Sequence, residues 1–250
     1  MDIELTSERT QYYCKFIKLP EPSSRRKNHM IGYEPINNDT IGVLHHILVY
    51  TCTGISELEM LAHHGDNQVT DDYFRCGDYT MEYFQKCLHS VAVWAVGGSG
   101  IDFKEDVGYP INGDYRADRY ALMEVHFDNP SETKPIHFQK AGLKLKFARN
   151  DRDIDAGLMN LGASWMFYLP PKQEKFSLWG TCSRDCLSHA NGQNDFEFNI
   201  FAAFAHGHRH LTDLTLSKVS KNSKNETVTK QVFKETNYDR FYQGMHTSIT

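Results

Sequence analysis

The sequence contains no run of apolar residues that approaches the ~20 needed for a membrane-spanning helix. Its first residues, MDIELTSERTQYYC, include neither a basic region nor an apolar stretch, so no secretory signal peptide is visible. Positive charge is not in excess either: the net charge is -5, which gives no support to a nucleic-acid partner. The chain therefore has a globular composition, and its 250 residues suffice for one large domain or two smaller ones.

Two common metal motifs are also missing. No HExxH is present, which removes the general-base glutamate expected of a zinc hydrolase. None of the six cysteines forms a CxxC pair; they are Cys14, Cys52, Cys76, Cys87, Cys182 and Cys186. The spacing of Cys182 and Cys186 leaves a zinc site open, but no second pair matches it.

The cysteines instead indicate disulfides and an oxidising compartment. Two glycosylation sequons agree with this: Asn38-Asp39-Thr40 and Asn225-Glu226-Thr227. Disulfides indicate the secretory pathway, yet no signal peptide is visible in this sequence. We therefore expect this chain to be part of a longer, secreted glycoprotein.

Short apolar and aromatic runs recur along the chain, separated by Gly, Pro, Asn and Asp, and predict strands. They cover residues 44–52, 91–98, 120–130, 140–148, 164–171, 196–219 and 227–235. Many short strands with turn signals predict an all-β fold of antiparallel sandwich or jelly-roll type. The polar stretch 148–157 is the candidate linker between two domains, 1–150 and 151–250, of which the second is predicted to be incomplete.

Thirteen histidines are many for this length, and three groups stand out. His45 and His46 begin one predicted strand, and His126 lies near the end of another. If residues 196–219 are a strand, the period of two places His208 and His210 on one face, as a clamp for one metal ion. Adjacent His45 and His46 would point to opposite faces unless the backbone twists or bulges. From spacing alone, metal binding and a purely structural role both remain open, and imidazole suits zinc, copper, iron and nickel alike.

Several motifs resemble those of a known family and occur in the same order along the chain. The family is the copper type II, ascorbate-dependent monooxygenases, which include dopamine β-monooxygenase and its monooxygenase-like relatives. The motifs are QYYCKFIKLP (11–20), HMIGYEP (29–35), LHHILVYTC (44–52), VWAVGGSG (93–100), LMEVHFDNP (122–130), DAGLMNLG (155–162), GTCSRDC (180–186) and HRHLTD (208–213). They extend over nearly the whole chain, so the resemblance is specific.

The resemblance implies two copper ions. His45, His46 and His126 would bind the electron-transfer copper, and His208 with His210 would bind the oxygen-activating one. In the family, the third ligand of the second ion is a methionine on a later strand, which would lie beyond the end of this chain. Met245 lies too early in the sequence to be this ligand.

Further roles follow from the same resemblance. Tyr12 and His208 would be catalytic, although a packed aromatic beside a disulfide explains Tyr12 equally well. Cys14 would pair with Cys76 and Cys52 with Cys87, and the partners of Cys182 and Cys186 would lie downstream.

Two residues depart from the dopamine enzyme, Asp128 for His and Asp213 for Gly, and the stretches HFDNP and HHILVY resemble the monooxygenase-like branch more closely. The implied activity is hydroxylation of an activated C–H bond of a small amine of phenylethylamine type, as in catecholamine metabolism. Dioxygen is the oxidant and ascorbate the electron donor, in the lumen of the secretory pathway or outside the cell. The alternative is a non-catalytic, secreted copper-binding β-sandwich or an inactive fragment. The sequence does not determine the oligomeric state.

Overall fold

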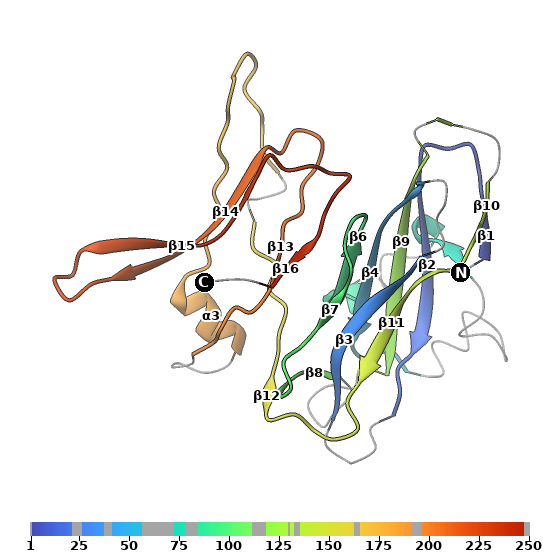
Figure 1. The fold of residues 1–250 in the computed structure, drawn as a ribbon, viewed down its shortest axis with the longest axis horizontal. Helices are drawn as coiled ribbons and strands as arrows, with labels where there is room; N and C mark the ends of the chain where they lie inside the picture. The colour runs from blue at the N-terminus through green and yellow to red at the C-terminus, as the bar shows by residue number, and fades with distance from the viewer. Residues whose placement is uncertain are drawn as a thin grey trace. The chain divides into compact units, whose positions relative to one another are not determined.

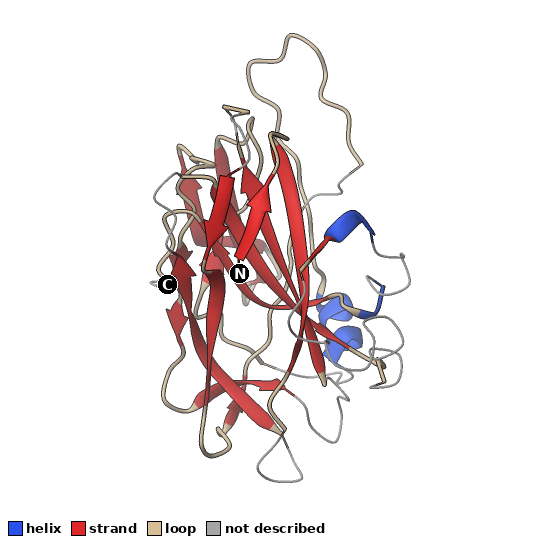
Figure 2. Cartoon of the chain, turned by 90° about the vertical axis from the view of Figure 1, so that its right-hand side faces the viewer, coloured by secondary structure: helices blue, strands red, loops and turns tan. Residues whose placement is uncertain are grey.

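The computed structural model describes residues 2–21, 27–37, 42–56, 73–78, 85–111, 119–129, 131–132, 136–162, 166–191 and 197–247 (Figure 1). The chain forms two compact units, one of Met1–Gly157 with Phe201–Thr250 and the other of Leu158–Ile200. Strands make up most of the regular structure in the described residues (Figure 2). The all-β fold predicted from the sequence is therefore confirmed, whereas the division into residues 1–150 and 151–250 stays a prediction.

The first sheet of the larger unit contains five strands in the order β5-β2-β9-β4-β6. Their bounds are β2 Thr10–Lys18, β4 Leu44–Cys52, β5 Phe74–Arg75, β6 His89–Ala95 and β9 Tyr120–Asp128. All four strand pairs are antiparallel. The central strand, β9, buries Ala121, Met123, Val125 and Phe127 at every second position, which is the pattern of a strand with one face on a core.

A second sheet has the order β11-β3-β8-β12, and β7 also pairs with β3. Its strands are β3 Asn28–Asn37, β7 Ile101–Asp102, β8 Val107–Ile111, β11 Ala141–Phe147 and β12 Ile154–Asp155. A further pair joins β1 Asp2–Leu5 to β10 Ile136–Gln139.

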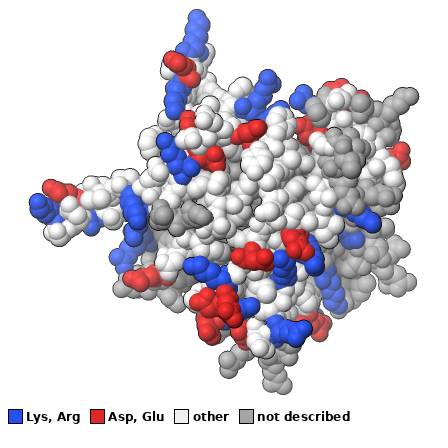
Figure 3. All heavy atoms as spheres, in the orientation of Figure 1, with Lys and Arg blue, Asp and Glu red and all other residues white. Residues whose placement is uncertain are grey.

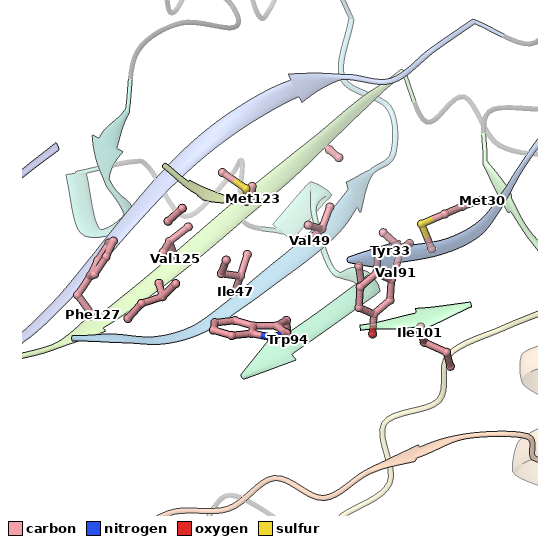
Figure 4. Close-up of a cluster of buried hydrophobic side chains, with 14 of the residues drawn as sticks. Met30, Tyr33, Ile47, Val49, Val91, Trp94, Ile101, Met123, Val125 and Phe127 are labelled. Carbon is pink, nitrogen blue, oxygen red and sulfur yellow. The ribbon is translucent and has the colours of Figure 1, made fainter. Parts of the chain in front are cut away.

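The hydrophobic core contains residues from both sheets, as in a β-sandwich. Ile47 and Val125 of the first sheet and Met30 of the second belong to this one buried cluster (Figure 4). The Tyr33 hydroxyl donates a hydrogen bond of 2.8 Å to the Val93 carbonyl, which connects the two sheets within the core. The core therefore fixes the face of β4 and β9 that points inward, and the opposite face is available for other side chains.

Two disulfides cover part of that opposite face. Cys14 pairs with Cys76 and Cys52 with Cys87, as the resemblance implies. They lie in a small apolar cluster that also contains Phe16, Tyr120 and Leu122. Each bridge is expected to contribute about 2–4 kcal/mol, mainly by restricting the unfolded chain. The short helix η1, Cys76–Asp78, begins at one of these cysteines.

The predicted linker, residues 148–157, is attached to the sandwich through His29. This side chain is fully buried; its Nδ1 accepts a hydrogen bond of 2.8 Å from the Arg152 amide, and its Nε2 lies 2.9 Å from a carboxylate oxygen of Asp155. Because Nδ1 must accept, Nε2 carries the proton and donates to Asp155. One neutral histidine thus connects two points of the linker to β3.

The C-terminal part of the larger unit contains two small antiparallel sheets. One pairs β13 Ala203–Phe204 with β16 Met245–His246, and the other pairs β14 Asp213–Lys221 with β15 Thr227–Thr236. The β14–β15 hairpin is rich in lysine, and positive side chains gather along it in Figure 3; they are Lys218, Lys221, Lys224, Lys230 and Lys234. Charged side chains of this kind discourage further strands from pairing with an exposed edge.

Two predicted strands are wrong in part. Among the described residues 197–219 only β13 and β14 are strands, and residues 205–212 form a loop with a turn at Arg209–His210. Within 164–171, the described residues 166–170 have no regular structure, and Tyr168 is 95% exposed. A strand needs a partner to satisfy its backbone groups, and β-propensity alone does not provide one. In the smaller unit, the regular element among the described residues is helix α3, Arg184–Asn191.

No described helix is long and apolar enough to cross a membrane.

Candidate metal centre

Strand β4 begins with two adjacent histidines, and its pairing with β9 places both on one side of the sheet. Leu44 lies opposite Phe127, whereas His46 lies opposite His126, so His45 is the additional residue of a β-bulge. A bulge inserts one residue into a strand and redirects its side chain. Adjacent residues of a regular strand point to opposite faces, so His45 and His46 can reach one ion only at a twist or bulge, and the structure contains the bulge.

Three imidazole nitrogens converge at this bulge. The Nδ1 atom of His46 lies 3.1 Å from Nδ1 of His45 and 3.3 Å from Nδ1 of His126. Ligand atoms of all three residues lie within 4.8 Å of one another. In a tetrahedral site with metal–nitrogen bonds of about 2.0 Å, neighbouring nitrogens are about 3.3 Å apart. The three histidines therefore already have the spacing of ligands to one ion.

The hydrogen bonding of His126 agrees with a metal ligand. Its Nε2 atom is buried and has no hydrogen-bond partner among the described residues. A buried donor left unpaired costs about 1–3 kcal/mol, so a structural histidine is expected to satisfy it. An ion bound at Nδ1 leaves Nε2 unpaired, but the free energy of metal binding would offset this cost. The donor set fits copper, because imidazole is one of its preferred ligands.

The electrostatic surroundings keep these rings neutral and able to bind metal. Burial, reinforced by the neighbouring histidines, lowers the pKa of His46 to about 3. Burial followed by the charge of His45 lowers the pKa of His126 to about 4. The pKa of His45 is also lowered, again mainly by burial. Protons therefore compete weakly with a metal ion at this site near neutral pH.

Tyr12 lies beside this group. It is opposite His126 in the β2–β9 pairing, and its ring stacks on the imidazole with centroids 4.3 Å apart. Burial, with smaller contributions from the negative charges of Glu124 and Asp128, raises the pKa of its hydroxyl, so Tyr12 is a phenol rather than a phenolate at neutral pH. The structure thus brings Tyr12 to the predicted site, and its catalytic role stays a prediction.

Further histidines lie close to the first group, and one of them, His206, was not among the predicted site residues. The ring of His206 is 6.0 Å from that of His46 and 5.6 Å from that of His208, measured between centroids. Residues 205–212 form a loop, in which the Leu211 amide donates to the His208 carbonyl, so the predicted strand that placed His208 and His210 on one face is wrong. Their binding to one ion stays a prediction; all three histidines of this loop are exposed, and the ring of His208 contacts that of His206.

His206 could have been found from the sequence. The stretch HGHRH contains two overlapping His-x-His pairs, 206/208 and 208/210, and nothing local decides between them. Among the described residues, no third His, Cys, Asp or Glu joins His206 and His208 in a compact ligand group.

An all-β sandwich with three convergent imidazoles offers a ligand set of the type that transition metals prefer. Comparison with known families makes this specific. Residues 1–134 match the N-terminal domain of the copper type II ascorbate-dependent monooxygenases, and residues 154–249 match the C-terminal domain. The chain belongs to this family, whose cofactors are copper and ascorbate.

Individual relatives are similar over most of the chain. DBH-like monooxygenase protein 1 of Gallus gallus is 31% identical over 212 residues, 83% of this chain and 32% of the relative. DBH-like monooxygenase protein 2 of Mus musculus is 30% identical over 92% of this chain and 34% of the relative. Dopamine beta-hydroxylase of Canis lupus familiaris is 27% identical over 92% of this chain and 36% of the relative. The chain thus spans about a third of the length of these relatives.

Proposed function

We propose that this chain is the copper-binding part of a monooxygenase that hydroxylates an activated C–H bond of a small amine of phenylethylamine type. The observation that supports the proposal is the convergence of three Nδ1 atoms at the β4 bulge. Those of His45 and His126 lie 3.1 Å and 3.3 Å from that of His46. Copper bound at the two histidine groups would pass two electrons from ascorbate to dioxygen, so that one oxygen atom enters the substrate and the other leaves as water.

The residues of the chain prepare the two groups for this chemistry. We assign His45, His46 and His126 to the first copper, held neutral by burial. We assign His208 and His210 to the second copper, as the family resemblance implies, and the ring of His206 lies near that of His208, with centroids 5.6 Å apart. Tyr12 covers one face of the His126 ring and limits how this ring can turn. Tyr12 and His208 remain the candidate catalytic residues, as the family resemblance implies; Tyr12 stacks on His126, and the ring of His208 contacts that of His206.

Metal stoichiometry tests the site assignment. After reconstitution with Cu(II) and dialysis, elemental analysis should find two copper ions per chain. His126→Ala should lose the ion of the first group and retain the other, and His210→Ala should do the reverse. His89→Ala, a change at an exposed histidine of β6, serves as the matched control and should retain both. Equal loss at both sites in His126→Ala would contradict two separate groups.

A non-catalytic copper-binding module is the second candidate function. It is favoured by one observation: the three-histidine group is complete within the sandwich, whereas the second group offers two histidines. Turnover of phenylethylamine separates the two candidates. Ascorbate-dependent formation of the hydroxylated amine, lost in His208→Ala, supports the monooxygenase. One copper ion per chain without turnover supports the module.

We further propose that the chain is a glycoprotein of the secretory lumen or the extracellular space. Its two disulfides support this, and so does the position of one sequon, since Asn225 is exposed in the turn of the β14–β15 hairpin. The other sequon, Asn38-Asp39-Thr40, lies outside the described residues. Expression in a secreting eukaryotic host, followed by enzymatic removal of N-glycans, should show one glycan fewer in Asn225→Gln than in wild type. Asn160→Gln, exposed and outside a sequon, is the control, and no difference between the two variants would contradict glycosylation at Asn225.

A further inference from the structure

We infer that the Asp128 carboxylate is an electrostatic partner of the first copper site, which favours Cu(II) over Cu(I) there and so lowers the reduction potential of the bound ion. The inference rests on one part of the proposed function, the copper ion at the three-histidine group, and does not depend on turnover. Asp128 is not itself a ligand: the compact ligand group that the described residues form here contains three histidines and no carboxylate.

The register of the sheet places Asp128 beside this group. It ends β9 two positions after His126, so its side chain projects from the same face of the strand. Its amide donates a hydrogen bond of 2.8 Å to the carbonyl of Val43, two positions before the bulged residue His45. The bulge therefore falls between the His46–His126 pair and Asp128, and the rings of His45 and His126 lie 4.9 Å apart, measured between centroids.

The charge of this carboxylate is only weakly neutralised. The side chain of Asp128 is 17% exposed, so little water surrounds it. The cation paired with it among the described residues is Arg9, whose Nε atom lies 3.8 Å from the carboxylate, beyond hydrogen-bond distance. Arg9 is itself 54% exposed, and an exposed charge at this distance is well screened by solvent. Asp128 therefore presents a nearly full negative charge to its surroundings.

That charge acts on the three-histidine group. Burial lowers the pKa of His45, and the negative charge of Asp128 is the largest contribution that opposes it. Burial and the charge of His45 lower the pKa of His126, and Asp128 again acts in the opposite direction. A carboxylate that stabilises positive charge on these rings also stabilises a cation bound to them.

The oxidation state of copper decides how large this stabilisation is. Reduction adds one electron, supplied by ascorbate in this family, and lowers the charge of the ion from +2 to +1. Coulomb energy is proportional to charge, so the carboxylate stabilises Cu(II) about twice as much as Cu(I). A nearby negative charge therefore opposes reduction, and its removal should favour Cu(I).

Arg240 offers a test with the opposite sign. Burial is the main cause of the lowered pKa of His45, and the positive charge of Arg240 contributes in the same direction. Its guanidinium lies over the ring of Phe241, 4.3 Å from the centroid. Removing this charge should favour Cu(II). An electrostatic effect thus changes sign between variants of Asp128 and Arg240, whereas a loss of packing weakens binding in both.

The variants isolate charge from size. Asp128→Asn and Asp128→Ser remove the charge and differ in volume, Asp128→Glu keeps the charge, and Arg240→Gln removes the opposing one. Asp106→Asn, at an exposed position before β8, is the matched control for loss of one carboxylate. All are made in the full chain carrying His210→Ala, so that the first site alone is titrated.

Affinities for Cu(II), and for Cu(I) under anaerobic conditions, are measured by competition with chelators of known affinity. Loss of one partner outside the ligand shell costs at least about 10-fold in metal affinity, and we expect this for Cu(II) in both uncharged variants. Half the Coulomb energy is lost for Cu(I), so its affinity should fall about 3-fold. The resulting 3-fold change in the ratio corresponds to a rise in potential of about 30 mV, at 59 mV per factor of ten.

The remaining variants complete the prediction. Asp128→Glu and Asp106→Asn should keep the parent ratio of Cu(II) to Cu(I) affinity, and Arg240→Gln should shift it toward Cu(II). An unchanged ratio in Asp128→Asn and Asp128→Ser overturns the inference, even if copper binds. Equal weakening of both oxidation states, or a shift toward Cu(I) in Arg240→Gln, overturns it as well, because either result indicates packing rather than charge. If Asp128→Asn does not fold, Asp128→Ser decides.

The outcomes also separate this inference from the proposed function. A parent chain that binds no copper contradicts both the inference and the assignment of the first copper. A ratio that shifts as expected, in a protein whose wild type does not hydroxylate phenylethylamine, retains the role of Asp128 and contradicts the monooxygenase.

Discussion

The ring of Tyr12 lies flat against the imidazole of His126, with centroids 4.3 Å apart and planes 8° from parallel. The two residues are directly opposed on neighbouring strands, so the contact is set by the β2–β9 register rather than by a flexible loop. Cross-strand aromatic pairs of this kind are a normal unit of sheet stabilisation. Here the pair also constrains a ring whose Nε2 atom has no hydrogen-bond partner in the part of the chain that the structure describes.

Replacing Tyr12 separates its stacking from its hydroxyl. Tyr12→Leu removes the flat contact, and we expect the first site to bind Cu(II) about 10-fold more weakly, because an unrestrained His126 ring loses orientation. Tyr12→Phe keeps the stack and should bind as wild type does. Competition titration with a chelator of known affinity measures both. A Tyr12→Phe variant that binds copper normally but forms no product would assign a catalytic role to the hydroxyl, whereas full turnover would leave Tyr12 a purely structural residue.

The lowered pKa values of the first histidine group predict that the metal-free protein loses stability in acid. The pKa of His46 is about 3 and that of His126 about 4 when folded, against about 6.5 in an unfolded chain. The unfolded state therefore binds more protons as the pH falls below 6.5. The contribution of these residues is fully present above pH 6.5, decreases below it, and reaches its minimum near pH 3–4, with a slope of at most about 1.4 kcal/mol per pH unit for each proton.

Thermal unfolding of the metal-free chain between pH 7.5 and 4 measures this effect. We expect the melting temperature to fall across this range, and to fall less steeply in His46→Asn, in which one depressed group is absent. His89→Ala, which changes an exposed histidine, should follow the wild-type curve. Identical pH dependence in wild type and His46→Asn would show that the histidine group is not the cause.

Much of the fold and the first site was predictable, because the signals are local. β4 and β9 appear in the sequence as short apolar runs with β-branched and aromatic residues, which is the local signal of a strand. His45 and His46 were recognisable as a pair, and the condition for their joint use, a bulge, followed from strand geometry. What the residues alone did not give was the partner strand, which determines that His46 faces His126.

The second group was predicted less well because distant residues decide its geometry. His206 and His210 are both two positions from His208, and the sequence does not show that the chain turns after His208 rather than extending. The contacts that hold the loop come from Tyr238 and Gln243, 31 and 37 positions from their partners. No periodicity or short motif carries such information.

Cys182 and Cys186 are predicted to be reactive. Both are free in the structure, with sulfur atoms 3.4 Å apart, too far for a bond of about 2.05 Å. Cys186 is exposed whereas Cys182 is partly buried, so Cys186 should be alkylated faster in the native protein. Labelling under denaturing, non-reducing conditions should find two thiols per chain, and mass spectrometry of native samples should give the order. A count of zero would mean that the two cysteines are bonded to each other.

The attachment of the linker to the sandwich through His29 yields a stability prediction. Asp155→Ala removes the acceptor of the His29 Nε2–H group, whose side chain is fully buried, so a donor is left without a partner at a cost of about 1–3 kcal/mol. The same change releases Lys27, but that ion pair is partly exposed and contributes little. Asp153→Ala, an exposed neighbour in the same segment, should change the free energy of unfolding by less than about 0.5 kcal/mol. Urea unfolding of the three proteins measures the difference; equal stability of the two variants would mean that His29 finds another acceptor, and that Asp155 does not secure the linker.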